Sequence, residues 1–119
     1  MPNSGIGQVL FVDRQPFDWS LTSWMGVSNF VLATMPWWDT PIRRKLEGPM
    51  LARYHAALVV RGITDYPMSQ LDADYRLCLA MAVAVPVEWC VLESDRERMR
   101  WLWTRQLERG LAALDDAGW

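Results

Sequence analysis

Apolar residues recur at steps of three and four along the middle of the chain, which is the period of an amphipathic helix. Thr40-Pro41 predicts where this helix starts, with Thr40 as the N-cap and Pro41 as the first helical residue. Gly48-Pro49 is expected to kink or divide the helix, and Gly62 is a suitable C-terminal cap. The apolar positions of the pattern are Ile42, Leu46, Met50, Leu51, Tyr54 and Leu58.

Two further helices are predicted toward the C-terminus. Ser69 with Asp72 resembles a capping box and opens the first of them, and Ser94 with Glu97 opens the second. Pro86 is expected to bend the first helix. The buried positions expected in the two helices are Leu71, Tyr75, Cys78, Leu79, Ala82, Val83, Val87 and Cys90, then Met99, Leu102, Gln106, Leu107, Leu111 and Leu114.

Proline and glycine mark the remaining helix boundaries. A short apolar helix is expected around residues 28–35, where Pro36 ends it, and Gly118 is expected to close the last helix. The chain is therefore predicted to be mainly α, with four or five helices in a single domain over residues 1–119.

One short strand is expected at the N-terminus. The run Val9-Leu10-Phe11-Val12, between Gly7 and Pro16, is typical of a buried strand, and Asp13 follows it directly. A lone strand cannot pair its own backbone donors and acceptors, and the rest of the sequence offers no second strand. The segment is therefore expected to be the remnant of a hairpin in an incomplete unit.

Composition and charge narrow the function classes. The net charge of -2 and the pI near 5.3 argue against a general nucleic-acid binder. Arg43-Arg44-Lys45 is expected to be a solvated helix face. The longest apolar run, residues 77–87, is too short to span a membrane, and no signal peptide is evident, so a cytoplasmic location is expected. Eight tryptophans indicate a bulky core or an apolar face that lacks its partner.

The two cysteines are not expected to form a disulfide. Cys78 and Cys90 lie in one predicted helix, where three turns would separate their Cα atoms by about 18 Å. Reduced thiols fit the expected cytoplasmic location.

Four segments together resemble the C-terminal part of the aminoglycoside-phosphotransferase-like and choline-kinase-like small-molecule kinases, which share the protein-kinase-like fold. Val9-Leu10-Phe11-Val12-Asp13-Arg14-Gln15 is similar to the family's strand that ends in an Ile-Asp-Trp-Gln type motif. Gly26-Val27-Ser28-Asn29-Phe30 stands where the family has Gly-x-x-Asp-Leu. Leu51-Ala52-Arg53-Tyr54-His55-Ala56-Ala57-Leu58 and Asp74-Tyr75-Arg76-Leu77 are similar to its helical segments. The resemblance covers nearly the whole chain and implies a helical C-terminal lobe.

The resemblance implies a role for Asp13 as a ligand of Mg²⁺, which bridges the phosphates of ATP during transfer of the γ-phosphate to a small-molecule hydroxyl. The alternative from residue type alone is a strand-end Asp that caps a turn. The helices would form the wall of the substrate site. Glu88, which interrupts an apolar helix, and Trp37 are the candidate substrate-binding residues. The simpler alternatives are an ion pair of Glu88 with an arginine of the last helix, and a Trp37-Trp38 pair that only fastens a loop to the core.

The sequence departs from the family in ways that bear on activity. The catalytic loop, a His-Gly-Asp motif with a downstream Asn, is expected just before residue 1, and neither it nor the nucleotide-binding lobe with its lysine is in this sequence. Arg14 replaces the usual aromatic residue, and Asn29 stands where an acidic residue braces the catalytic loop. The chain alone is therefore expected not to transfer phosphate.

Two other hypotheses remain. One is that a cationic substrate is attracted by four aspartates, Asp72, Asp74, Asp115 and Asp116. His55, the only histidine, is expected to be structural. The alternative function is a non-catalytic helical module that binds a protein partner, or a second copy of itself, through the apolar face that a missing lobe would have covered.

Overall fold

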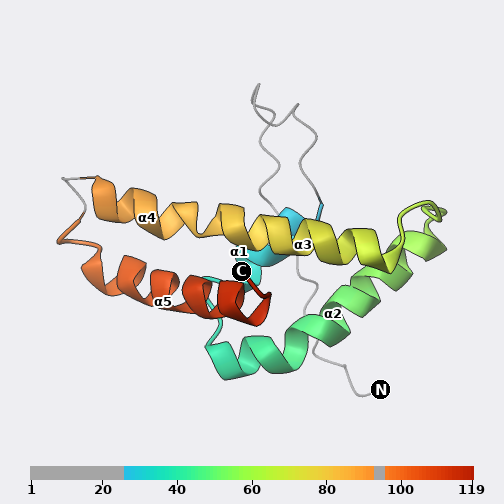
Figure 1. Ribbon diagram of the computed structural model, residues 1–119, viewed down its shortest axis with the longest axis horizontal. Coiled ribbons are helices and arrows are strands. Elements are labelled where there is room, and N and C mark those ends of the chain that lie inside the picture. The colour runs from blue at the N-terminus through green and yellow to red at the C-terminus, as the bar shows by residue number, and fades with distance from the viewer. Residues whose placement is uncertain (1–25, 93–95) are drawn as a thin grey trace, which may run out of the picture.

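The computed structural model describes residues 26–92 and 96–119, so the predicted strand, Asp13 and Ser94 lie outside the described residues. The described part is mainly helical, as the sequence predicts, and both cysteines are free. None of its helices is long and apolar enough to cross a membrane. Its five helices, shown in Figure 1, are α1 (Val27–Thr34), α2 (Thr40–Val60), α3 (Met68–Ala82), α4 (Ala84–Val91) and α5 (Arg100–Asp116).

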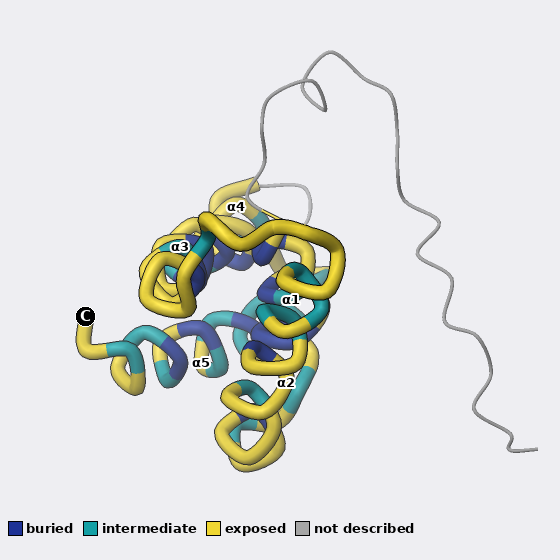
Figure 2. Tube along the Cα trace, turned by 90° about the vertical axis from the view of Figure 1, so that its right-hand side faces the viewer, coloured by how far each residue is buried: buried dark blue, intermediate teal, exposed yellow. Residues whose placement is uncertain are grey.

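α3 is the centre of the arrangement. It contacts α1, α2 and α5, and α4 continues from its end and packs along α5 (Figure 1). The buried sides of α1, α3 and α5 face one another, whereas most of α2 is exposed (Figure 2). The apolar core that results contains Val27, Val31, Met35, Leu51, Leu71, Tyr75, Cys78, Leu79, Ala82 and Ala113.

α2 matches its predicted span, with one boundary correction. Asp39 rather than Thr40 is the N-cap, so Thr40 and Pro41 both lie in the first turn. Gly48-Pro49 does not divide the helix, although Figure 1 shows that its axis bends between its two halves, as expected at an internal proline. Gly62 adopts a φ of 87° and closes a Schellman motif, in which Ile63 N–H donates to Leu58 and Gly62 N–H donates to Val59.

The capping box predicted at Ser69 and Asp72 is wrong. α3 begins at Met68 after an extended Pro67, and both residues of the expected box lie inside the helix. Pro67 fixes an extended backbone directly before the helix, and the amides of Gln70 and Leu71 both donate to its carbonyl oxygen. A side-chain cap is therefore not what starts this helix.

Pro86 has a larger effect than the predicted bend. Proline lacks the amide that would donate to the carbonyl four residues earlier, and its ring crowds that turn. The helix accordingly ends at Ala82 and restarts at Ala84, which gives α3 and α4 separated by Val83. Beyond this interruption, Val87 is exposed instead of buried as predicted.

The last helix starts later than predicted. α5 begins at Arg100, and Glu97 lies in the preceding turn, where its carboxylate is 3.3 Å from Arg100 Nη1. Gly118 closes the helix with a φ of 79°, as predicted. The buried positions are only partly those expected, because Gly110 and Ala113 are buried with Gln106 while Leu111 is exposed.

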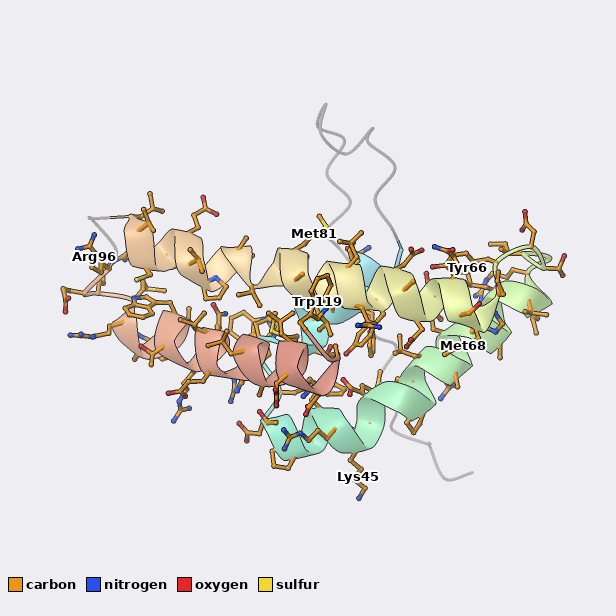
Figure 3. The ribbon with its side chains drawn as sticks, viewed as in Figure 1. Lys45, Tyr66, Met68, Met81, Arg96 and Trp119 are labelled. Atoms are coloured by element: carbon orange, nitrogen blue, oxygen red, sulfur yellow. The ribbon has the colours of Figure 1, made fainter. Side chains whose placement is uncertain are left out.

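The basic cluster of α2 is only in part the solvated face that was expected. Arg43 is only 1% exposed, and Arg44 and Lys45 are exposed beside it. Lys45 projects away from the rest of the molecule in Figure 3. The apolar row Ile42, Leu46 and Met50, predicted to be buried, is instead between 37% and 48% exposed. α2 thus turns a charged residue inward and part of its apolar face outward.

Candidate functional site

The strongest candidate site is a polar cavity of about 280 Å³ where α2, α3 and α5 meet. A cavity of this size is at the lower end of what holds a small ligand. Three helices contribute charged residues to its lining, and apolar core residues form its floor. Its lining is Arg43, Glu47, Gly48, Leu51, Asp72, Tyr75, Arg76, Leu79, Ala113, Asp116 and Ala117.

A buried arginine holds this polar cavity together. Arg43 Nη1 donates to Glu47 Oε2 at 2.5 Å, and Arg43 Nη2 donates to the carboxylate of Asp116 at the end of α5. Arg44 donates to both oxygens of the same Asp116 carboxylate, at 2.8 and 3.0 Å. Within the described residues, Arg43 Nε has no hydrogen-bond partner. The cluster fastens the start of α2 to the end of α5.

Tyr75 joins α3 to this cluster. Its hydroxyl donates to Glu47 Oε2 at 2.6 Å, so this carboxylate oxygen accepts from Tyr75 and from Arg43. Burial of the ring, and then the hydrogen bond to a carboxylate, raise the pKa of Tyr75 far above its ordinary value. The hydrogen bonds from Arg44 and Arg43 lower the pKa of Asp116. Tyr75 therefore stays neutral and Asp116 charged across the physiological range of pH.

Two charged groups of the polar cavity are left without a hydrogen-bond or ion-pair partner among residues 26–92 and 96–119. They are Asp72 and Arg76, which lie four residues apart on α3. An added Cβ at Gly118 would lie 3.9 Å from Arg76 Nη2, so the guanidinium reaches toward the end of α5. The cavity can thus offer one carboxylate and one guanidinium to a small polar molecule.

Of the four aspartates predicted to attract a cation, the structure brings two to this polar cavity. Asp72 and Asp116 line it, and the second is already neutralised by two arginines. Asp74 instead accepts from Tyr66 Oη at 2.5 Å and from Gln70 Nε2 at 2.8 Å, and Asp115 is exposed.

The predicted substrate-binding residues lie elsewhere. Glu88 is exposed on α4 and has no charged partner in the described part of the chain, so the expected ion pair with an arginine of α5 does not form there. Trp37 is exposed in the loop between α1 and α2. Arg109 of α5 donates to the carbonyl oxygens of Pro36 and Trp37, both at 3.0 Å, and thereby fastens this loop. Neither side chain lines the polar cavity.

His55 has the structural role that the sequence predicts. It is half-buried on α2, and its Nε2 lies 2.9 Å from the carbonyl oxygen of Tyr66, just before α3. This contact joins the C-terminal part of α2 to the segment that leads into α3.

The metal role of Asp13 stays a prediction, because the residue lies outside the described part. Among residues 26–92 and 96–119, no group of three or more His, Cys, Asp or Glu side chains could hold a metal ion. Comparison with protein-family models, with curated proteins and with solved structures gives no match to this chain.

Sequence reasoning did not find the Arg43 cluster as a unit. The Arg43–Glu47 pair has the four-residue spacing of a helical ion pair, which is a local signal. Asp116 lies 73 residues from Arg43, and only the packing of α5 on α2 brings them together. The contact of Asp116 with Arg43 therefore depends on the tertiary fold and has no signal in the local sequence.

Proposed function

We propose that this chain is the helical C-terminal lobe of a small-molecule phosphotransferase of the aminoglycoside-phosphotransferase-like and choline-kinase-like class, and that it does not transfer phosphate by itself. In the complete protein, Asp13 would hold Mg²⁺ and the helices would form part of the substrate wall. The metal would supply charge neutralisation at the phosphates of ATP.

One observation carries the proposal: the three resembling segments within the described residues pack against one another. An added Cβ at Gly26 would lie 2.5 Å from Tyr54 Oη, which accounts for glycine at the first position of its segment. Phe30 of the same segment packs on Tyr75 with ring centroids 6.1 Å apart. Residues 26–30, 51–58 and 74–77 therefore share one core, as parts of a common ancestral lobe would.

The proposal is tested in the nucleotide sequence upstream of the codon for Met1. It expects an in-frame segment that encodes a glycine-rich loop, a strand lysine and a His-Gly-Asp motif. The protein with that segment should consume ATP in the presence of Mg²⁺ and a panel of small-molecule alcohols. Asp13→Ala should abolish this activity, whereas Asp18→Ala, a matched change in the same region, should retain it. An upstream sequence without these motifs would contradict the proposal.

A second candidate function rests on a different observation. Ile42, Leu46 and Met50 form an exposed apolar row on α2, with four-residue spacing that places them on one side of the helix. Such a row is typical of a helix that packs against a partner. The second proposal is a non-catalytic module that associates with a second copy through this row.

Sedimentation equilibrium tests the second candidate. A reversible dimer is expected, and Leu46→Glu should shift it to monomer because a charge would be buried in the interface. Lys45→Glu is the matched control, since Lys45 projects away from the other helices (Figure 3) and should leave the dimer intact. A monomer at every protein concentration would exclude the association.

A further inference from the structure

An apolar groove lies on the side of α3 that faces α1, separate from the polar cavity. Its volume is about 130 Å³, and its lining is Ser28, Leu32, Cys78, Met81, Ala82 and Val85, from α1, α3 and α4. Leu32, Met81 and Val85 are exposed at its rim, and Met81 projects outward from α3 in Figure 3. An apolar cavity of about 150 Å³ admits one benzene ring. The groove therefore has the size and chemistry for a single phenyl group.

The described part of the chain begins beside this apolar groove. Ser28 lines the groove and lies two residues after Gly26, where the described part begins. The longest uninterrupted apolar run in residues 1–25 is residues 9–12, which include Phe11. Fifteen residues separate Val12 from Ser28. Fully extended, they reach about 50 Å, so the run can return to the groove without strain.

We propose that the apolar groove is the docking site of residues 9–12 of the same chain, with the ring of Phe11 as its occupant. The phenyl ring matches the volume of the groove, whereas the indole rings of Trp19 and Trp24 are larger. Phe17 has the right ring, but Pro16 and Asp18 flank it, so it lacks the apolar neighbours that would cover the rim. Docking would hold Asp13 close to α1 and α3. This contact does not depend on the proposed phosphotransferase ancestry.

The reactivity of Cys78 reports on the apolar groove, because this buried thiol lines it. The parent for the experiment is the full chain with Cys90→Ser, so that Cys78 is the only thiol. Its rate of reaction with a small disulfide reagent is measured at constant pH, because the thiolate is the reactive form. Phe11→Ala should raise this rate roughly tenfold or more, because the groove loses its cover. Phe17→Ala, the same change at the other phenylalanine of this region, should leave the rate unchanged.

Added benzene separates an emptied groove from a damaged fold. Benzene should slow the reaction in Phe11→Ala, because it replaces the missing ring, and should leave the parent rate unchanged. If Phe11→Ala loses its helical circular dichroism, Phe11→Leu serves instead, with an intermediate rate expected. The proposal is overturned if benzene protects the parent chain, since the groove would then be vacant. It is also overturned if the two alanine variants react alike, or if dilution raises the parent rate, which would identify a second copy as the cover.

Discussion

The polar cavity and the apolar groove, which both lie beside α3, differ in how far the described residues satisfy the groups that line them. In the polar cavity, Arg43 and Tyr75 donate to carboxylates from α2 and α5, and Asp72 and Arg76 are the charged side chains of the lining that have no partner among the described residues. In the apolar groove, Leu32, Met81 and Val85 stay exposed. Most charged groups of the polar cavity are thus paired with one another, whereas the apolar side chains at the rim of the apolar groove are not covered by the described residues.

This difference separates a structural network from a binding surface. Perturbed pKa values often mark functional sites, yet ion-pair networks produce them as well. The raised pKa of Tyr75 follows from burial and a hydrogen bond to Glu47, and the lowered pKa of Asp116 from two arginines. These shifts therefore report how α2, α3 and α5 are held together. In the apolar groove, burial raises the pKa of the Cys78 thiol, but no ion pair lies behind this shift. The exposed rim of the groove, rather than its pKa values, distinguishes it from the polar cavity.

The largest expected effect is that of removing the buried charge. Arg43→Ala should lower the free energy of unfolding by about 3–5 kcal/mol, because Glu47 and Asp116 would lose their common buried partner. Arg44→Ala, the matched change at an exposed partner of Asp116, should have a much smaller effect. Urea unfolding of both variants checks this. Equal losses would show that burial of Arg43 does not govern the cluster.

Acid should weaken the ion pairs of the polar cavity, because they need a charged Asp116, and should not affect the apolar contacts of the groove. Because the pKa of Asp116 is lower in the folded chain than its ordinary value of about 3.9, its contribution to stability is complete above that pH. The contribution is lost as the pH falls through the folded pKa. Urea unfolding between neutral pH and about pH 3 should show this loss, and Asp116→Asn should reduce the slope. An unchanged slope in the variant would assign the acid sensitivity to other carboxyl groups.

A smaller loss is expected at Gly110, where α5 approaches the break between α3 and α4. An added Cβ would lie 2.9 Å from Val83 Cγ2 and 3.4 Å from Met35 Sδ. Gly110→Ala should therefore lower the free energy of unfolding by about 1 kcal/mol, because overpacking exceeds the gain in helix propensity. Thermal unfolding measures the change. A stabilised variant would show that Val83 and Met35 can move to accommodate the added methyl group.

The smallest effect is a gain at Gly48, the matched helical glycine. It lies within α2, and an added Cβ would meet no atom within 4 Å. Gly48→Ala should raise the free energy of unfolding by about 0.5–1 kcal/mol through helix propensity alone. The same thermal assay checks it, and a loss of stability would indicate that the bend next to Pro49 requires glycine.

Local rules predicted most of the helical framework. The 3.6-residue period placed the helices, and the glycine caps at Gly62 and Gly118 are confirmed because a positive φ is a local requirement. The expected box at Ser69 failed because the backbone of Pro67 starts α3 without a side-chain cap. Pro86 was recognised, but whether a proline bends or interrupts a helix depends on the packing around it.

The polar cavity was less predictable than the helices. Periodicity assigns apolar residues to the core, so it placed Leu46 inside and Arg43 outside. The actual rotation of α2 depends on Asp116 and Tyr75, which reach Arg43 and Glu47 only in the tertiary fold. Glu88 and Trp37 were proposed from residue type and resemblance, and their role in substrate binding stays a prediction.

The most direct test of the proposed function is a calorimetric titration of the 119-residue chain with Mg²⁺-ATP, with Asp13→Ala as the control. A lobe without the lysine and the catalytic loop should give no binding heat in either protein. Micromolar binding that disappears in Asp13→Ala would contradict the account, because the helical lobe would then assemble a nucleotide site by itself.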